Sequence, residues 1–218
     1  AVGTNHGPIV GNPQWGQGGW NGQCIILNGS TDYISLSQIP VTTSEFTVAA
    51  WANHYGDGYG GVNPIFTQRD DASTYGSATS SVGLLSDDGS NNSNASIRGA
   101  SNSGPSTQLK EPVKPFDEWH HYAMVVTEED FIFYIDGQEV DSIINPEDGI
   151  YDNSIDHINI GAHIYGGSVQ QLFYGAIDDV RVYNNALTVD EIRQIPEPGT
   201  ISLLIFGGYF AMRKRKHT

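Results

Sequence analysis

The chain has 218 residues, of which 25 are acidic and ten basic. Residues 196–218 contain four of the basic residues and one of the acidic ones, so residues 1–195 carry 24 acids against six bases, a formal charge of −18. A surface of this sign repels nucleic acid and anionic membranes, while it suits solubility outside the cell and the binding of hard cations. The single cysteine, Cys24, excludes an internal disulfide and is expected to be a small buried side chain, because it lies in an apolar stretch.

Short runs of alternating apolar residues, separated by Gly, Ser, Asn and Asp, predict an all-β, antiparallel sandwich or jelly roll. Two of the predicted strands flank Asp136-Gly137, a dipeptide that accepts the positive φ angles of a tight primed turn, so they are expected to form a hairpin. Thr188 is expected to cap a short helical turn that ends near residue 195. The predicted strands are 23–27, 33–36, 46–54, 63–69, 81–86, 95–98, 119–127, 131–135, 138–143, 157–161 and 175–183.

Tyrosines in glycine-rich loops are the candidate ligand-binding residues. Tyr55, Asp57 and Tyr59 share one such loop, and Tyr165 lies in a second one. A flat aromatic ring can stack on the C–H face of a sugar while nearby amides and carboxylates bind its hydroxyl groups, so the pattern predicts a glycan site. The alternative is that both loops are ordinary long turns.

The four tryptophans are expected to pack rather than to bind. Trp51 and Trp119 lie in predicted strands and are assigned to the core. Trp15 and Trp20 lie in a glycine-rich segment that is expected to cover a sheet.

Several segments in the order of the chain resemble LamG-like, concanavalin A-like jelly-roll domains. The resemblance implies that residues 1–195 form one such domain, a fold that lectins, enzyme modules and adhesive domains share. The matching segments are 27–34 (Leu-Asn-Gly-Ser-Thr-Asp-Tyr-Ile), 46–51 (Phe-Thr-Val-Ala-Ala-Trp), 119–123 (Trp-His-His-Tyr-Ala), 133–137 (Phe-Tyr-Ile-Asp-Gly) and 173–188, which includes Ile-Asp-Asp-Val-Arg-Val-Tyr.

The resemblance also implies a structural calcium ion and a missing strand. Calcium prefers carboxylate and carbonyl oxygens from loops, and the family pattern places Asp178 and Asn5 as its candidate ligands. The alternative is that Asp178 is a plain strand residue. The first strand of the family pattern is not found before residue 3, so we expect either a shortened sequence or a strand donated by a second copy, with an open edge beside the closing strand.

A catalytic role is not expected. Retaining glycosidases place two carboxyl groups about 5–5.5 Å apart. Residues 139–145 begin the Glu-x-Asp-x-x-Glu pattern of glucanases with this fold, but Ile144 and Asn145 stand where the second glutamate is required. His120 and His121 are adjacent, so in a strand they point to opposite faces and cannot hold a metal side by side.

The C-terminal segment 196–218 predicts export. Pro196, Glu197 and Pro198 precede an apolar run, 199–212, that ends in four basic residues. This order predicts a short hydrophobic helix in a bilayer with its basic end in the cytoplasm, although the run is shorter than the roughly 20 residues of a full span. It resembles the PEP-CTERM sorting signal, which implies an exosortase-type processing enzyme and transient anchoring in the inner membrane of a Gram-negative bacterium. The alternative is a buried C-terminal helix.

The sequence therefore predicts an exported or cell-surface, non-catalytic module that binds extracellular polysaccharide or glycoprotein. Two alternatives stay open: a matrix or filament subunit that assembles with itself, and a glycan-cleaving enzyme.

Overall fold

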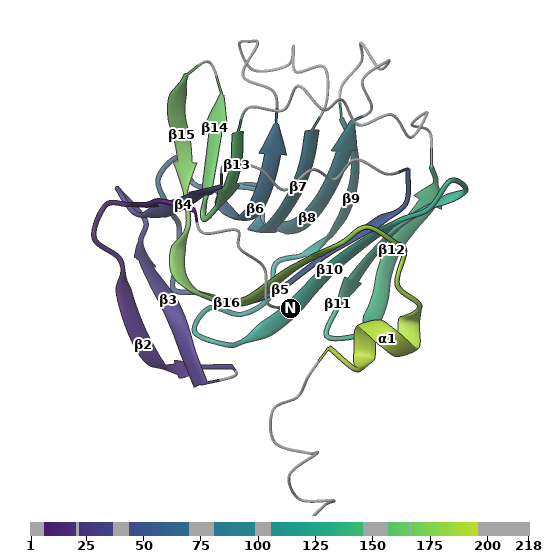
Figure 1. Cartoon of the computed structure of the whole chain (residues 1–218), viewed down its shortest axis with the longest axis horizontal. Helices are drawn as coiled ribbons and strands as arrows, with labels where there is room; N and C mark the ends of the chain where they lie inside the picture. The colour runs from purple at the N-terminus through teal and green to yellow at the C-terminus, as the bar shows by residue number, and fades with distance from the viewer. Residues whose placement is uncertain are drawn as a thin grey trace, which may run out of the picture.

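The computed structural model describes residues 7–20, 22–36, 44–69, 81–98, 106–145, 157–165 and 167–195. They form two antiparallel sheets of seven strands each and one separate hairpin (Figure 1). The first sheet has the order β1 (Ile9–Val10), β4 (Tyr33–Leu36), β13 (His157–Ile160), β6 (Asn63–Arg69), β7 (Ser81–Asp87), β8 (Asn92–Arg98) and β9 (Thr107–Pro112). The second has the order β12 (Gln138–Ile144), β11 (Asp130–Ile135), β10 (His120–Val126), β5 (Phe46–His54), β16 (Tyr174–Tyr183), β3 (Gly22–Asn28) and β2 (Gln14–Gly19).

The predicted all-β sandwich is thus confirmed, and strands 46–54 and 63–69 have the predicted bounds. The Asp136-Gly137 turn is confirmed as well, since both residues have positive φ, 52° and 69°. Among the described residues β16, the closing strand, pairs with β5 along most of its length but with β3 only over Tyr174–Ile177, so the edge or gap expected beside it stays a prediction for its second half.

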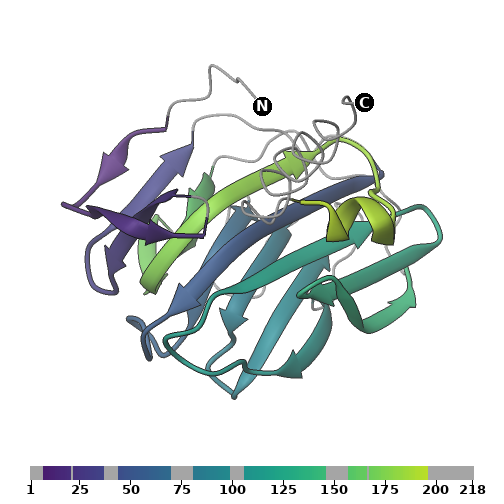
Figure 2. The same ribbon diagram turned by 90° about the horizontal axis from the view of Figure 1, so that it is seen from below.

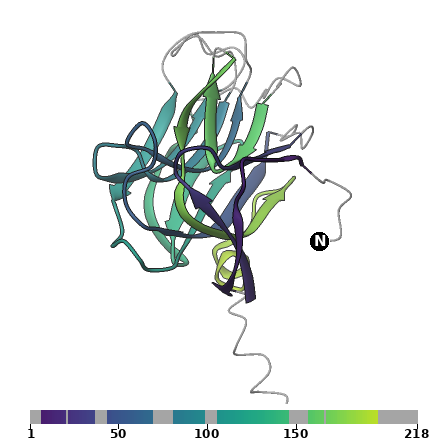
Figure 3. The same ribbon diagram turned by 90° about the vertical axis from the view of Figure 1, so that its left-hand side faces the viewer.

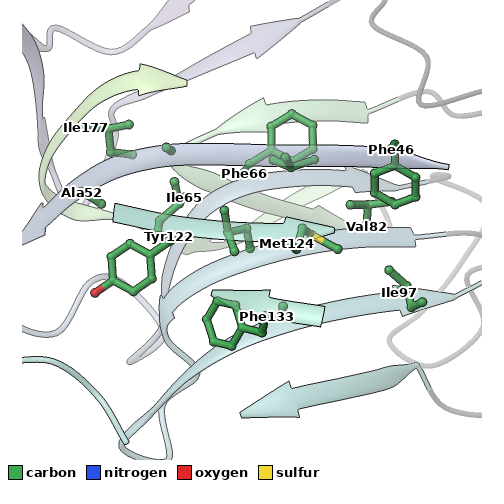
Figure 4. Packing of buried hydrophobic residues seen from close by; sticks show 14 of the residues in the cluster. Phe46, Ala52, Ile65, Phe66, Val82, Ile97, Tyr122, Met124, Phe133 and Ile177 are labelled. Atoms are coloured by element: carbon green, nitrogen blue, oxygen red, sulfur yellow. The ribbon is translucent and has the colours of Figure 1, made fainter. Parts of the chain in front are cut away.

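The hydrophobic core lies between the two sheets, where alternate residues of facing strands interdigitate (Figure 4). In β5 the core residues are Phe46, Val48, Ala50 and Ala52, which follow the period of two that a strand imposes. The other residues of β5 are also buried, because additional elements cover the outer face of the second sheet.

One of these covering elements is α1 (Val189–Arg193), which lies against the outer face of the second sheet (Figure 2). Ile192 and Ile195 pack there against Ala49, Ala123 and Val125 in a second hydrophobic cluster. The predicted cap is confirmed: the Thr188 side chain accepts the backbone N–H of Glu191, whose carboxylate accepts the backbone N–H of Thr188.

The remaining element is the hairpin of β14 (Ala162–Tyr165) and β15 (Ser168–Leu172), which stands at the opposite end of the molecule from α1 (Figure 3). Its residues Ala162, Ile164 and Leu172 form a small hydrophobic cluster of their own.

In the part of the chain that the structure describes, no helix is long and apolar enough to cross a bilayer. The C-terminal helix predicted for residues 199–212 lies outside the described residues, as do Asn5, Pro196, Glu197 and Pro198.

Candidate functional site

The outer face of the first sheet carries a groove of about 350 Å³, which we call the polar groove. The register of the strands decides which residues form the floor of the groove, because residues directly opposite each other on neighbouring strands project to the same face. Ser81 pairs with Arg69 on one side and with Arg98 on the other, which makes one row across three strands. Two residues further along, the next row is Thr67, Gly83, Ser96 and Gln108.

Gly83 lowers the centre of this floor, because it has no side chain. A Cβ atom at this position would lie 2.7 Å from Oγ of Ser96, so a side chain there would collide with the neighbouring strand. Asn94, in the row beyond, is 3% exposed, and its Nδ2 atom has no hydrogen-bond partner among the described residues. A buried amide donor at the surface of a groove favours a ligand that brings an acceptor, since an unmade hydrogen bond costs about 1–3 kcal/mol.

The β14–β15 hairpin forms one wall of the polar groove. Thr67 fixes it to the floor by donating its Oγ1 hydroxyl to the carbonyl oxygen of Ala162, at 2.7 Å. His163 and Gln171 on this wall line the groove, and Nδ1 of His163 lies 2.8 Å from Oε1 of Gln171. Burial, together with the charge of Arg69, lowers the pKa of His163, so the ring is neutral near pH 7.

Among the described residues, the charged side chains that line the polar groove are three cations, Arg69, Arg98 and Lys110, and one carboxylate, Asp88. Lys110 and Asp88 form an ion pair with 2.7 Å between Nζ and Oδ2. Burial opposes the charged form of Asp88, but the hydrogen bond from Lys110 and the backbone N–H of Ser90 outweigh it and lower the pKa of this carboxyl group. Asp88 is therefore ionised and balances Lys110.

The predicted loop residues do not line the polar groove. Tyr55 packs edge-on against Tyr174, with ring centroids 5.8 Å apart, and burial raises the pKa of its hydroxyl group. Tyr59 is 58% exposed and Asp57 is exposed beside it. Tyr165 ends β14 opposite Ser168. The loop thus presents one open aromatic ring, that of Tyr59, at the surface.

Asp178 lies at a bulge of β16, where the register with β5 shifts and Asp179 takes a positive φ of 49°. Its Oδ1 atom accepts the backbone N–H of Asp179, and Asp179 is itself paired with Arg181 at 2.8 Å. Among the described residues there is no group of three or more His, Cys, Asp or Glu side chains that would hold a metal ion. Because Asn5 lies outside the described residues, the calcium site expected at Asp178 and Asn5 stays a prediction.

The outer face of the second sheet has a different hollow, of about 460 Å³, which we call the tryptophan cleft. Trp20 stacks on Trp51 with ring centroids 3.8 Å apart, and His121 packs against Trp51 from the side. Trp51 lies in β5 and is buried, as predicted, and it packs beneath Trp20 on the outer face of the second sheet. Trp119 directly precedes β10 and is half-buried at the tryptophan cleft. Its Nε1–H donates to the carbonyl oxygen of Gly18.

The two histidines of this region are packing residues. The register places His121 opposite Trp51 and His120 opposite Ala52, so they alternate across β10 as expected. His120 has Nδ1 2.8 Å from Oδ2 of Asp136. Desolvation lowers the pKa of His121 to about 4. Trp51, His121 and the Trp20 above them form a buried aromatic stack that fixes the β2–β3 hairpin on the sheet.

The acidic residues of β12 are hydrogen-bonded at its surface. Glu139 accepts the Ser142 hydroxyl, and Asp141 accepts the backbone N–H of Lys110 on the neighbouring sheet. Ile144, at the end of the same strand, is exposed.

Comparison with known proteins agrees with this architecture. Residues 28–193 match the family described as the concanavalin A-like lectin/glucanases superfamily, so the chain belongs to that family. A comparison with curated proteins found no match.

Three solved structures share the fold. Domain 4 of AbnA, a GH43 extracellular arabinanase from Geobacillus stearothermophilus, in complex with arabinotriose, is 20% identical and covers 85% of this chain and 81% of its own, with a TM-score of 0.66. The CBM40 of Ruminococcus gnavus IT-sialidase bound to α2,3 sialyllactose is 13% identical, with coverages of 78% and 94% and a TM-score of 0.62. The binding domain of botulinum neurotoxin DC in complex with SialylT is 12% identical, with coverages of 87% and 45% and a TM-score of 0.60.

The residues that line the polar groove were not predicted as a binding site from the sequence. Its signal is present in the sequence as polar residues at every second position, Ser81 and Gly83 in one strand and Asn94, Ser96 and Arg98 in the next. Such a pattern describes any solvent-facing sheet surface, and only the register shows that these positions meet in one hollow.

Proposed function

We propose that this protein is a non-catalytic, exported module that binds extracellular glycans through the polar groove. The observation that carries the proposal is the groove itself: a hollow on one sheet face, floored by hydroxyl, amide and guanidinium groups around a glycine. Sugars present hydroxyl groups on every side, so a floor of mixed donors and acceptors with room for a ring suits them.

The similar structures support this proposal. The arabinanase domain, part of an extracellular enzyme, was solved with arabinotriose, and the CBM40 of the sialidase was solved with sialyllactose. The predicted sorting motif Pro196-Glu197-Pro198 and the basic C-terminal end support export, with an exosortase-type enzyme as the processing partner.

The exposed ring of Tyr59 is proposed as an additional sugar contact outside the groove.

Calcium is proposed as a structural ligand near Asp178 on the family resemblance alone. If it binds there, added calcium will raise the melting temperature, and Asp178→Asn will remove that rise. An equal melting temperature with calcium and with a chelator counts against it.

The function is tested by binding of the full chain to immobilised and soluble polysaccharides, acidic and neutral. Ser96→Leu places an apolar side chain on the groove floor, while the matched control Ser142→Leu alters an exposed serine on β12 of the other sheet. We expect Ser96→Leu to weaken binding at least tenfold and the control to bind as the unchanged protein does. Unchanged binding by Ser96→Leu would show that the groove is not the site, and release of reducing sugar would show an enzyme instead.

A further inference from the structure

The tryptophan cleft lies on the opposite sheet from the polar groove and has the composition of a ligand pocket. Its volume of about 460 Å³ is sufficient for a small ligand. Three of the four tryptophans of the chain line it, together with Ile192 and Ile195. Trp20 and Trp119 are half-buried, so part of each ring is open to a molecule that enters the hollow.

Two buried ring nitrogens of the tryptophan cleft lack a hydrogen-bond partner. Trp51 is 6% exposed and His121 is 3% exposed, and both residues line the hollow. Within the part of the chain that the structure describes, no group hydrogen-bonds to Nε1 of Trp51 or to Nε2 of His121. A buried indole N–H usually has a partner, because an unmade hydrogen bond costs free energy. Packing alone therefore does not account for these two atoms, and a bound group that supplies their partners would be stabilised.

The charged side chains of this lining, among the described residues, already have partners within the chain. Oδ2 of Asp136 lies 2.8 Å from Nδ1 of His120, and its Oδ1 accepts the backbone N–H of His121 at 2.9 Å. Nε of Arg193 donates to the carbonyl oxygen of Gly137 at 3.1 Å. The cleft therefore suits an uncharged ligand with hydrogen-bonding groups better than it suits an ion.

An acetamido group has the features that match this lining. Its carbonyl oxygen can accept the indole N–H of Trp51. Burial lowers the pKa of His121 to about 4, so the ring is neutral near pH 7 and one of its nitrogens accepts. With the ring proton on Nδ1, the acetamido N–H can donate to Nε2, and in the other tautomer the carbonyl oxygen can accept from Nε2 as well. The methyl group suits contact with Ile192, Ile195 and the indole rings, which a hydroxyl group does not.

We propose that the tryptophan cleft is a second ligand site, separate from the polar groove, and that it binds a sugar carrying an acetamido group. The sugar ring contacts the half-buried indoles of Trp20 and Trp119, and the acetamido group bonds to Trp51 and His121. This inference goes beyond the proposed function, because it holds whether or not the polar groove binds glycans. The two hollows lie on the outer faces of opposite sheets of the sandwich (Figure 1), so one molecule can hold two glycan chains at once.

The first test uses the unchanged full chain and two trisaccharides that differ in this group. Triacetylchitotriose carries an acetamido group on each ring where cellotriose carries a hydroxyl group. By isothermal titration calorimetry we expect triacetylchitotriose to bind at least tenfold more tightly than cellotriose. Equal binding of the two sugars, or binding of neither, would overturn the inference, while the polar groove is tested separately by Ser96→Leu.

Tryptophan fluorescence then locates the bound sugar. Trp15 is 61% exposed and lies outside the lining of the cleft, so in Trp15→Phe every remaining tryptophan lines the cleft. We expect triacetylchitotriose to shift the emission of this variant and to reduce its quenching by acrylamide. Calorimetric binding without any change in emission or quenching would place the sugar elsewhere and overturn the inference.

A substitution that fills the cleft gives the third test. Gln138→Trp adds a large side chain at an exposed position of the lining, and the matched control Gln14→Trp alters an exposed glutamine of β2 outside it. We expect Gln138→Trp to weaken the binding of triacetylchitotriose at least tenfold and Gln14→Trp to leave it unchanged, with equal melting temperatures. Full affinity in Gln138→Trp would overturn the inference, and so would a loss of triacetylchitotriose binding in Ser96→Leu, which would place this sugar in the polar groove.

Discussion

The Nη1 atom of Arg69 lies 3.3 Å from Nε2 of His163, although the two residues are 94 positions apart in the chain. Because Nη1 is the donor, Nε2 accepts, and the ring proton is on Nδ1, which donates to Oε1 of Gln171 at 2.8 Å. The wall of the polar groove and its floor are thus joined by one chain of hydrogen bonds with a fixed direction.

Replacement of His163 by alanine is expected to weaken glycan binding several-fold, because the wall of the polar groove loses a side chain that is hydrogen-bonded to Arg69 and Gln171. His163→Gln is expected to retain most of the affinity, since a glutamine carbonyl can accept in the same role. Calorimetry on both variants measures the effect. Equal loss in the two variants would mean that the imidazole ring itself, rather than its acceptor, is needed.

His121 makes the fold sensitive to acid. Its pKa is about 4 in the folded protein against 6.5 for an ordinary histidine, so below pH 6.5 the unfolded chain takes up a proton that the folded protein does not. Stability from this group is present above pH 6.5 and is lost as the pH falls toward 4, by about 3 kcal/mol in total.

We therefore expect His121→Gln to reduce the pH dependence of the unfolding free energy between pH 6.5 and 4.5, whatever its effect at pH 7. Urea unfolding at several pH values measures this slope. A variant whose slope equals that of the unchanged protein would place the acid sensitivity in other groups.

Trp20→Ala is expected to cost about 2 kcal/mol of unfolding free energy, because it removes a ring that stacks on Trp51 at 3.8 Å and exposes the aromatic surface beneath. The matched control is Trp15→Ala on the same hairpin, where the ring is 61% exposed and little burial is lost. Urea unfolding of both variants gives the comparison. Similar losses for the two would contradict a special role for the stack.

Tyr59→Ala tests the loop that the sequence singled out. Since the ring of Tyr59 is largely exposed, its removal is expected to leave the melting temperature unchanged and, if the ring stacks on a sugar, to weaken glycan binding two- to tenfold. Tyr55→Ala does not test the sugar contact by itself, because Tyr55 packs against Tyr174 and its loss also disturbs the loop. Full affinity in Tyr59→Ala would exclude the loop as a contact.

The strands that could be predicted from the sequence are those with strong apolar alternation or β-branched residues. β5 and β6 are such strands, and the hairpin at Asp136 was marked by its turn dipeptide. β2 was missed because Gln-Trp-Gly-Gln-Gly-Gly has almost no intrinsic strand preference. It is held by pairing with β3 and by the stacking of the adjacent Trp20, which are contacts that local sequence does not encode.

The candidate site was harder to predict than the fold for a physical reason. Aromatic residues in glycine-rich loops attract attention by type, which is why Tyr55 and Tyr59 were selected. Arg69 and Arg98 are single basic residues at strand ends, separated by 29 positions in the sequence. Their place in one row of the groove floor depends on the register of β7 between them, which a single sequence leaves undetermined.

The place of β16 in the second sheet has a consequence for the order of folding. β16 is the last strand among the described residues, and it lies between β5 and β3, two strands that precede it by more than a hundred residues. At a synthesis rate of 5–20 residues per second, the edge of β5 stays unpaired for roughly 10 s after it has been made. The second sheet cannot close before β16 has been made, so the nascent chain stays accessible to a chaperone until that strand has emerged.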